Sequence, residues 1–515
     1  MDEKQNSTST TEIKKKRHKR INKLTIIELV VLSIVVASLL FLSLLKDKVS
    51  QGNTNKPDAS VGIQDSLDGE DVEDGEIGEI VRDGEDGEAV QDGEDNQGNI
   101  VPEITLTPVE IEQQFLKEAE EKAEEDEKKE KDQKIDVLIE KSNLLAMGYD
   151  YDAAIELIKS FGNDFAEYEK LNTAIASYKA TKETLVPLGS YDSASQISHI
   201  FFHSLIADTD KAFDGDSKSN GYNYYMTTIS EFNKMMQQMY YDGYVLVSIH
   251  DVAKEVTAPD GTTKFVPGDI LLPPDKKPFV LSQDDVNYYP YMDGDGFASR
   301  IVIDDTGRPS NEMIMEDGTV SVGDYDMVPA LETFIAEHPD FSYQGARGIL
   351  AITGYEGTLG YRTNDSTSPT YEQDRETVKK VAKVLKNWGW EFASHSYGHR
   401  DMLTYSYKFL ITDSDRWMDE VGSLIGPTDI YVFPYGIDIK TSIDTYSSDK
   451  YNYLKSLGFN YFCGVYKDPW IQIQGEYVRM TRRALDGQAM IQYPERLADL
   501  FDLSTVLDVK RPALK

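Results

Sequence analysis

Two histidines four residues apart are the first sign of chemistry in this sequence. His395 and His399 come directly after an apolar, strand-like run that begins at Trp390. A turn of helix after that strand would place both imidazoles on one side of the chain, converging on a single point. The 515-residue chain contains only 7 histidines, which favours a shared ligand. A coincidental pair of surface or capping histidines is the alternative.

Two adjacent carboxylates end another apolar run. Asp284 and Asp285 follow residues 279–283, and one of them would be enough to cap a helix. Two imidazoles and one carboxylate form a nitrogen, nitrogen and oxygen ligand set that suits zinc or a similar divalent cation. The carboxylate left over could accept a proton from an attacking water. The residues therefore predict a hydrolytic metal site.

Three segments together resemble the motifs of the polysaccharide deacetylases, the NodB-like carbohydrate esterases. Segments 282–285 (Ser-Gln-Asp-Asp), 395–399 (His-Ser-Tyr-Gly-His) and 433–436 (Phe-Pro-Tyr-Gly) are similar to the family's Asp-Asp, His-x-x-x-His and Pro-Tyr motifs. An apolar run that ends at His203 precedes the Asp-Asp motif. This order of motifs resembles that of the permuted poly-N-acetylglucosamine deacetylase branch. The resemblance covers roughly residues 198–486.

The resemblance implies a role for particular side chains. A divalent metal, with zinc expected and cobalt, nickel or manganese as alternatives, would be held by Asp285, His395 and His399. Asp284 would be the general base, His203 the general acid, and the backbone N–H of Tyr435, next to Pro434, would stabilise the oxyanion. The substrate would be acetyl groups, N-acetyl rather than O-acetyl, of a cell-surface polysaccharide such as poly-N-acetylglucosamine or peptidoglycan.

The sequence departs from the family pattern at three positions. Gln283 and Val286 stand where the family has Phe and Gly, and losing the glycine narrows the backbone conformations allowed at that turn. Val432 stands where the family has an arginine that orients the base. These differences leave a second hypothesis open, a catalytically inactive glycan-binding pseudoenzyme.

Two other features bear on the site, and the first could compensate for the missing arginine. Arg482 or Arg483, with Asp486 as partner, could replace the missing arginine, although ordinary surface charge is the alternative. A long insertion, residues 288–370, could cover the barrel or line a glycan groove through Tyr288, Tyr289 and Tyr291. A glycosidase is disfavoured because neighbouring carboxylates cannot flank a glycosidic bond at the required separation.

The C-terminal two thirds of the chain alternate apolar runs with helical patterns. Several runs end in a polar residue, which is typical of a parallel β/α barrel with chemistry at the carboxyl ends of its strands. The family fold is a distorted barrel of about seven strands, and we expect one in residues 186–515. The chain has one cysteine, Cys463, so an intramolecular disulfide is excluded.

The N-terminal part predicts a membrane anchor. Residues 1–23 are basic and predict a cytoplasmic N-terminus, and residues 24–45 are apolar and long enough to cross a bilayer as a helix. A cleaved signal peptide is the alternative. Residues 46–108 repeat Asp-Gly-Glu and predict a disordered acidic linker. We therefore expect a single-pass protein of the cell membrane with an extracellular catalytic domain.

Residues 109–185 predict a helical segment that resembles one tetratricopeptide unit around Gly148. It would serve as a stalk or bind a protein partner, and a membrane-tethered assembly platform acting through these helices is a third hypothesis. The formal net charge of −37 argues against nucleic acid as a partner.

Overall fold

The computed structural model describes residues 107–162 and 164–514. The expected basic N-terminus, membrane anchor and nearly all of the acidic linker lie outside the described residues. Among the described helices, none is both long enough and apolar enough to cross a bilayer. The chain divides into two compact units, and the larger one includes the described residues from Lys134 onward.

A helical segment precedes the barrel strands. Helix α2 (Pro108–Met147) is exposed along its first half, and its buried side chains begin at Ile135. Helices α3 (Tyr151–Lys159) and α4 (Glu169–Lys182) follow, and their buried side chains join one apolar cluster with Ile135. The Asp150 carboxylate starts α3 by accepting a hydrogen bond from the Ala153 N–H at 2.9 Å.

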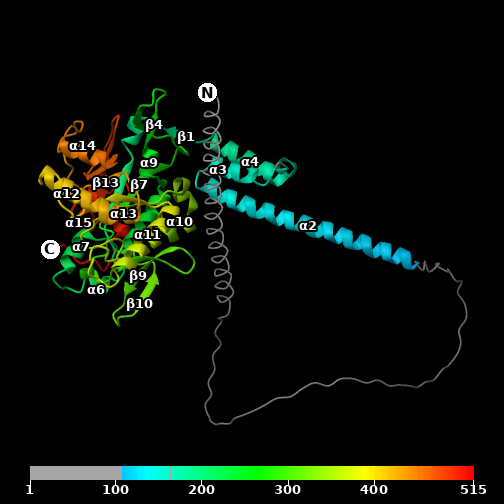
Figure 1. Ribbon diagram of the computed structural model, residues 1–515, viewed down its shortest axis with the longest axis horizontal. Coiled ribbons are helices and arrows are strands. Elements are labelled where there is room, and N and C mark those ends of the chain that lie inside the picture. Colours follow the sequence, from blue (N-terminus) through cyan, green and yellow to red (C-terminus); the bar gives the residue numbers. More distant parts are fainter. Residues whose placement is uncertain (1–106, 163, 515) are drawn as a thin grey trace, which may run out of the picture. The chain divides into compact units, whose positions relative to one another are not determined.

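Seven parallel strands close into a barrel, which confirms the expected fold class (Figure 1). Strand β16 pairs with β2 on one side, and β7 pairs with both β2 and β11, so the ring has no free edge. In order around the ring, the strands are β2 (Ser198–Phe202), β7 (Lys277–Gln283), β11 (Ile349–Ile352), β12 (Glu391–Ser394), β13 (Ile430–Val432), β14 (Tyr461–Val465) and β16 (Val478–Ala484). Strand β3 (Tyr244–Leu246) extends the sheet beside β7, and β15 (Ile471–Ile473) runs antiparallel to β16.

Side chains alternate between the two faces of each barrel strand, as the pleat requires. On β7, Phe279 and Leu281 pack in the cluster that contains the helix side chains Phe232 and Met235, whereas Val280 belongs to the second cluster. The outer layer is formed by α8 (Ile229–Tyr241), α10 (Met327–Glu337), α11 (Tyr371–Asn387), α12 (Tyr407–Trp417) and α14 (Asp449–Ser456). The second cluster also contains Ala351 of β11, Ala393 of β12 and Cys463 of β14.

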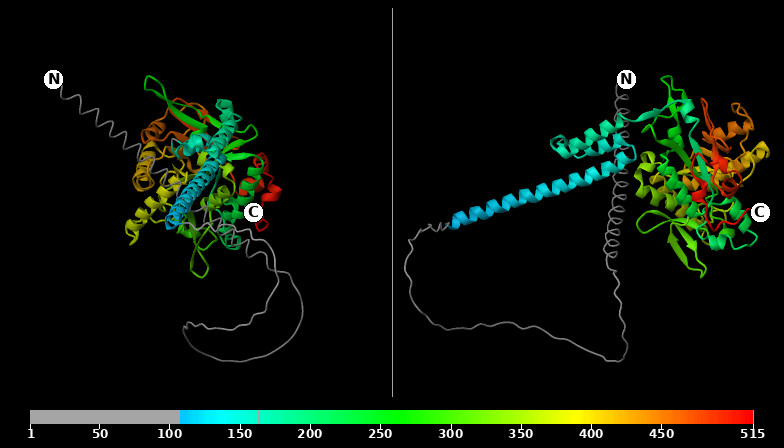
Figure 2. Two further views of the ribbon diagram at one scale, coloured as in Figure 1. Left: turned by 90° about the vertical axis from the view of Figure 1, so that its right-hand side faces the viewer. Right: turned by 180° about the vertical axis from the view of Figure 1, so that it is seen from behind.

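Smaller sheets and short helices complete the domain. The hairpin that contains β4 and the hairpin of β9 and β10 project from opposite ends of the barrel domain (Figures 1 and 2). The additional strands are β1 (Val186–Leu188) paired with β6 (Ile270–Leu272), β4 (Ala253–Thr257) paired with β5 (Thr263–Pro267), and a sheet of β8 (Arg300–Ile303), β9 (Pro309–Ile314) and β10 (Val320–Gly323). The short helices are α5 (Tyr191–Ala194), α6 (Thr209–Ala212), α7 (Ser219–Tyr225), α9 (Ile249–Val252), α13 (Ser423–Ile425), α15 (Gly487–Gln492) and α16 (Leu503–Val506).

His250, in α9, joins three segments of the barrel. Its Nδ1 lies 2.5 Å from a Glu391 carboxylate oxygen at the start of β12, and its Nε2 lies 2.9 Å from an Asp429 carboxylate oxygen just before β13. Burial lowers the pKa of His250, but the hydrogen bonds with Asp429 and Glu391 outweigh it and raise the pKa to about 10. The ring is therefore an imidazolium that donates both N–H groups at neutral pH.

Replacing this histidine should destabilise the fold in a pH-dependent way. We expect His250→Ala to lower the free energy of unfolding by about 1–2 kcal/mol at pH 6, less than for a fully buried pair because the side chain is 41% exposed. Because the pKa of His250 is higher in the folded protein than in the unfolded chain, its protonation stabilises the fold. This contribution is complete below the unfolded pKa of about 6.5 and is lost as the pH approaches 10. Urea unfolding at pH 6 and pH 10 should therefore show the difference from wild type shrinking. A difference that is equal at both pH values would contradict the assignment.

Candidate active site

The polar residues singled out in the sequence gather at the carboxyl ends of the barrel strands. Because the strands are parallel, the segments that follow them meet at one mouth of the barrel. Asp284 and Asp285 follow β7, His395 and His399 follow β12, Tyr435 follows β13, His203 follows β2, and Arg482 lies on β16.

Asp285, His395 and His399 form a donor set of the kind that holds a divalent cation. Each offers one ligand atom, and these atoms all lie within 4.8 Å of one another. The His399 Nε2 is 3.9 Å from an Asp285 carboxylate oxygen, too far for a hydrogen bond. The three groups therefore converge without satisfying one another. Two nitrogens and one oxygen fit zinc and similar ions.

The buried His395 is oriented for such a role. Its Nδ1 lies 2.8 Å from the Val432 carbonyl oxygen, which can only accept, so Nδ1 carries the hydrogen and Nε2 keeps its lone pair. Burial lowers the pKa of His395 to about 4, against the opposing effect of Asp284. The ring is therefore neutral at physiological pH. Val432, one of the positions that depart from the family pattern, supplies the orienting carbonyl.

The turn that carries the two histidines is not helical, so the expected turn of helix was wrong. Ser396 and His399 have φ angles of 57° and 49°, in the left-handed region. The Asp413 carboxylate, on α12, accepts hydrogen bonds from the backbone N–H groups of Tyr397 at 2.7 Å and Gly398 at 2.8 Å. These two bonds hold the turn, in which the ring centroids of His395 and His399 lie 4.9 Å apart.

Arg482 is the arginine that contacts the expected base. Its guanidinium donates to both carboxylate oxygens of Asp284, at 2.6 and 3.0 Å, and both side chains are buried. Burial would raise the pKa of Asp284, but the charge of Arg482 holds it well below its ordinary value. Arg482 also donates to Ser282 Oγ at 3.2 Å, and that oxygen lies 2.9 Å from His199 Nε2. Asp284 is thus a fixed carboxylate, 3.8 Å from His395 Nε2.

The structure places Arg483 away from the site. Successive residues of a strand face opposite sides, so Arg483 points out of the barrel where Arg482 points in. Its guanidinium donates to the Asp499 carboxylate at 2.6 Å and to Ser198 Oγ at 3.0 Å. Of the two arginines that the sequence left open, only Arg482 bonds Asp284.

His203 lies close enough to both Asp284 and Asp486 to interact with each electrostatically. His203 is half-buried, and its Nδ1 is a buried atom with no hydrogen-bond partner among the described residues. Burial raises the pKa of Asp486, and the neighbouring His203 opposes this rise. Asp486 also caps α15 by accepting from the Ala489 N–H at 2.7 Å. Asp486 is therefore a neighbour of His203, and its hydrogen bond goes to the helix rather than to an arginine.

The Pro-Tyr motif borders His399. Pro434 is buried and begins the short 3-10 helix η6 (Pro434–Gly436). Tyr435 has a φ of 57°, and its ring centroid lies 4.5 Å from that of His399. The Tyr435 side chain is 62% exposed, so it forms part of the rim of the site.

The altered residues of the Asp-Asp motif are accommodated. The left-handed residue of this turn is Asp285, with a φ of 57°, and the fully buried Val286 packs in the core, so no glycine is required there. The Gln283 amide donates to both Asp326 carboxylate oxygens at 2.8 Å. Sequence reasoning missed Tyr289 as a partner of Asp285: its hydroxyl donates to a carboxylate oxygen at 3.0 Å.

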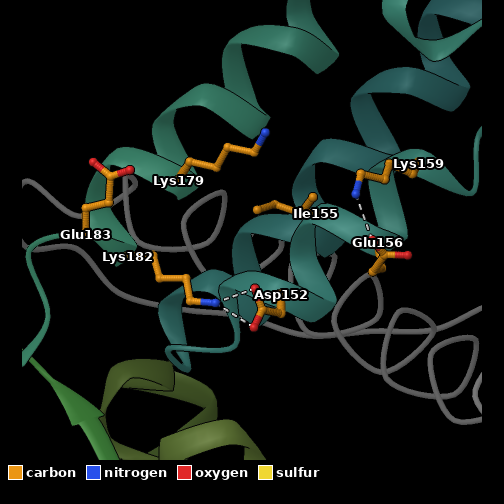
Figure 3. A pocket seen from close by; sticks show the side chains of 7 residues that line it. All are labelled: Asp152, Ile155, Glu156, Lys159, Lys179, Lys182 and Glu183. Atoms are coloured by element: carbon orange, nitrogen blue, oxygen red, sulfur yellow. Dashed lines mark hydrogen bonds and ion pairs between the residues drawn. The ribbon is translucent and has the colours of Figure 1, made fainter. Parts of the chain in front are cut away.

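A second hollow, of about 340 Å³, lies between α3 and α4 (Figure 3). Its wall is charged, and Lys182 and Lys159 pair with Asp152 and Glu156. It contains neither a histidine nor a cysteine, and two of its three acids are paired with lysines. The barrel mouth is therefore the candidate active site.

Comparison with known proteins gives distant structural likenesses. No protein-family model matches the chain, and no curated protein matches its sequence. A structure of the Streptococcus pyogenes deacetylase PplD in complex with acetate is 13% identical, covers 62% of this chain and 100% of its own, and has a TM-score of 0.33. A de-N-acetylase from Aggregatibacter actinomycetemcomitans is 15% identical, covers 57% of this chain and 95% of its own, and has a TM-score of 0.33. A polysaccharide deacetylase from Bacillus cereus is 10% identical, covers 58% of this chain and 68% of its own, and has a TM-score of 0.31. Likenesses at these values assign no function to the chain.

The donor set predicts how cation binding responds to substitution. We expect His399→Ala and Asp285→Ala each to weaken zinc binding by at least about 100-fold, because each removes one of three ligands. Isothermal titration calorimetry on the full chain would measure this. The matched control is His203→Ala, a histidine of the same mouth outside the donor set, which should retain the wild-type affinity. Equal affinities for all four proteins would contradict the site.

Proposed function

We propose that this protein is a metal-dependent hydrolase that removes acetyl groups from a cell-surface polysaccharide. The observation that carries the proposal is the convergence of Asp285, His395 and His399 beside a carboxylate, Asp284, that Arg482 holds ionised. A cation site next to a fixed base is an arrangement that can activate water for cleavage of an acyl bond. The motif resemblance favours N-acetyl groups, with poly-N-acetylglucosamine and peptidoglycan as the candidate polymers.

The proposed reaction needs one divalent cation, for which Asp285, His395 and His399 are the ligands. When bound, zinc (or cobalt, nickel or manganese) would supply a positive charge that polarises the acetyl carbonyl and makes water more acidic. Neutral His395 supports this assignment, since its lone pair is available without the loss of a proton at physiological pH.

The protein's own groups would move the protons. Asp284 takes a proton from water as the water oxygen bonds to the acetyl carbon, and Arg482 keeps the carboxylate ionised until then. The Tyr435 N–H would donate to the oxyanion that develops. His203 would donate a proton to the departing amine as the carbon–nitrogen bond breaks. The products are acetate and a free amino sugar.

The alternative of an inactive glycan-binding protein rests on the altered motif residues. Gln283 and Val286 are packed without disturbing Asp284 or Asp285, and Arg482 contacts the base in place of the arginine that Val432 replaces. These contacts favour the enzyme. The membrane anchor, the extracellular location and a protein partner for α2–α4 remain proposals that rest on the sequence.

Acetate release tests the function directly. We expect the protein to release acetate from N-acetylglucosamine oligosaccharides, to lose this activity with a chelator and to regain it with zinc. Asp284→Asn should lower kcat by at least about 1,000-fold while zinc affinity persists, because it removes the base and leaves the ligands in place. Asp468→Asn, an exposed aspartate, is the matched control. Acetate release at the wild-type rate from Asp284→Asn would rule out the mechanism.

The ion pair predicts a change in the pH profile. Arg482 lowers the pKa of Asp284, so Arg482→Met should raise that pKa. Because the base works only as a carboxylate, the acid limb of kcat/KM should move to higher pH, and Arg482→Lys should move it less. Arg483→Met, which breaks the contact with Asp499 instead, should leave the limb in place. An unshifted limb in Arg482→Met would show that Asp284 is not the titrating base.

A further inference from the structure

Three tyrosines form one aromatic stack beside the candidate cation site. The Tyr289 ring lies between the other two, with its centroid 5.6 Å from that of Tyr291 at an interplanar angle of 11°, and 5.6 Å from that of Tyr355 at 28°. Tyr289 is 6% exposed, whereas Tyr291 is 54% exposed and Tyr355 is 38% exposed. The inner ring is thus covered by its neighbours, and each outer ring presents surface to solvent.

The stack is fixed to the segments that carry the cation ligands. The Tyr289 hydroxyl donates to the Asp285 carboxylate at 3.0 Å. On the other side, the backbone N–H groups of Gly354 and Tyr355 donate to the Tyr397 carbonyl, at 2.9 and 3.2 Å, in the turn between His395 and His399. The Tyr289 ring is thus bonded to Asp285, and the backbone of Tyr355 is bonded to the histidine turn, by contacts that need no ligand.

The stack joins segments far apart in the sequence. Tyr289 and Tyr291 follow β7, and Tyr355 follows β11, the neighbouring strand of the barrel. Tyr435 adds a further exposed ring at the site, with its centroid 4.5 Å from that of His399. Exposed aromatic rings around a hydrolytic site can contact a chain-like substrate that continues past the reacting group.

We propose that the exposed faces of Tyr291 and Tyr355 bind a sugar ring of the polysaccharide next to the ring that loses its acetyl group. This inference rests on the proposed function and names a subsite of that same site. A pyranose ring has an apolar face of C–H groups that packs on an aromatic ring, while its hydroxyls remain in water. Tyrosine suits such a platform because its ring is rigid and its hydroxyl tolerates solvent.

Substitution of the outer rings tests the platform. We expect Tyr291→Ala and Tyr355→Ala each to raise the KM for acetate release from an N-acetylglucosamine pentasaccharide by about 10-fold with little change in kcat. The increase should be much smaller on the N-acetylglucosamine monosaccharide, which cannot reach both subsites. Tyr291→Trp should restore the low KM. Tyr241→Ala, an exposed tyrosine on α8, is the matched control and should behave as wild type.

Binding measured without catalysis separates this inference from the proposed function. In the Asp284→Asn background, calorimetry should show the pentasaccharide binding about 10-fold more weakly when Tyr291→Ala is added. If the wild type releases no acetate but Tyr291→Ala still weakens binding, the platform stands and the hydrolase proposal fails. Unchanged KM and affinity in Tyr291→Ala and Tyr355→Ala, or an equal loss on monosaccharide and pentasaccharide, would overturn the platform.

Discussion

The buried ion pair between Arg482 and Asp284 is the interaction on which the candidate site depends. A carboxylate that is 3% exposed would take up a proton if it had no cation beside it. Arg482, on β16, reaches it with two hydrogen bonds across the intervening strand β2, so the pair depends on the pairing of both β16 and β7 with β2. Ser282 and His199 satisfy further polar atoms around it. The same contact thus ties the fold to the ionisation state of the group that would act as base.

A second constraint is the strained backbone at the barrel mouth. Asp285, His399 and Tyr435 all have φ between 49° and 57°, a conformation that costs non-glycine residues of order 1–3 kcal/mol each. Such residues persist only when their surroundings hold them. Asp413 does this for the histidine turn through two backbone N–H groups, and the packing of Val286 does it for the aspartate turn. The contacts of the folded barrel therefore offset the cost of the backbone conformation that brings the three ligand groups together.

Residues 288–370, expected as one insertion, contain the barrel strand β11, so the whole range is not an insertion. Tyr288 is buried, and its hydroxyl bonds the Asp326 carboxylate at 2.7 Å and the Asn311 amide at 3.1 Å; Asp326 also accepts from the Gln283 amide and the Leu205 N–H, which fixes this segment to the ends of β7 and β2. The next residue, Tyr289, turns toward Asp285 instead. One tyrosine therefore fixes the segment after β7 to the domain, and its neighbour links that segment to the site.

Much of this protein is determined locally and could be predicted from its sequence. The alternation of apolar runs with helical patterns predicted the parallel barrel, and the residue types of Asp285, His395 and His399 predicted the donor set that the structure brings together. The sequence could not choose between Arg482 and Arg483, because the choice depends on which face of β16 points inward once its register with β2 is set. It also could not show that Asp285 rather than Val286 takes the left-handed conformation, or that Tyr355 completes a stack with Tyr289. Residue type and spacing are properties of the chain, whereas register, ring closure and contacts between distant loops arise only when the whole barrel packs.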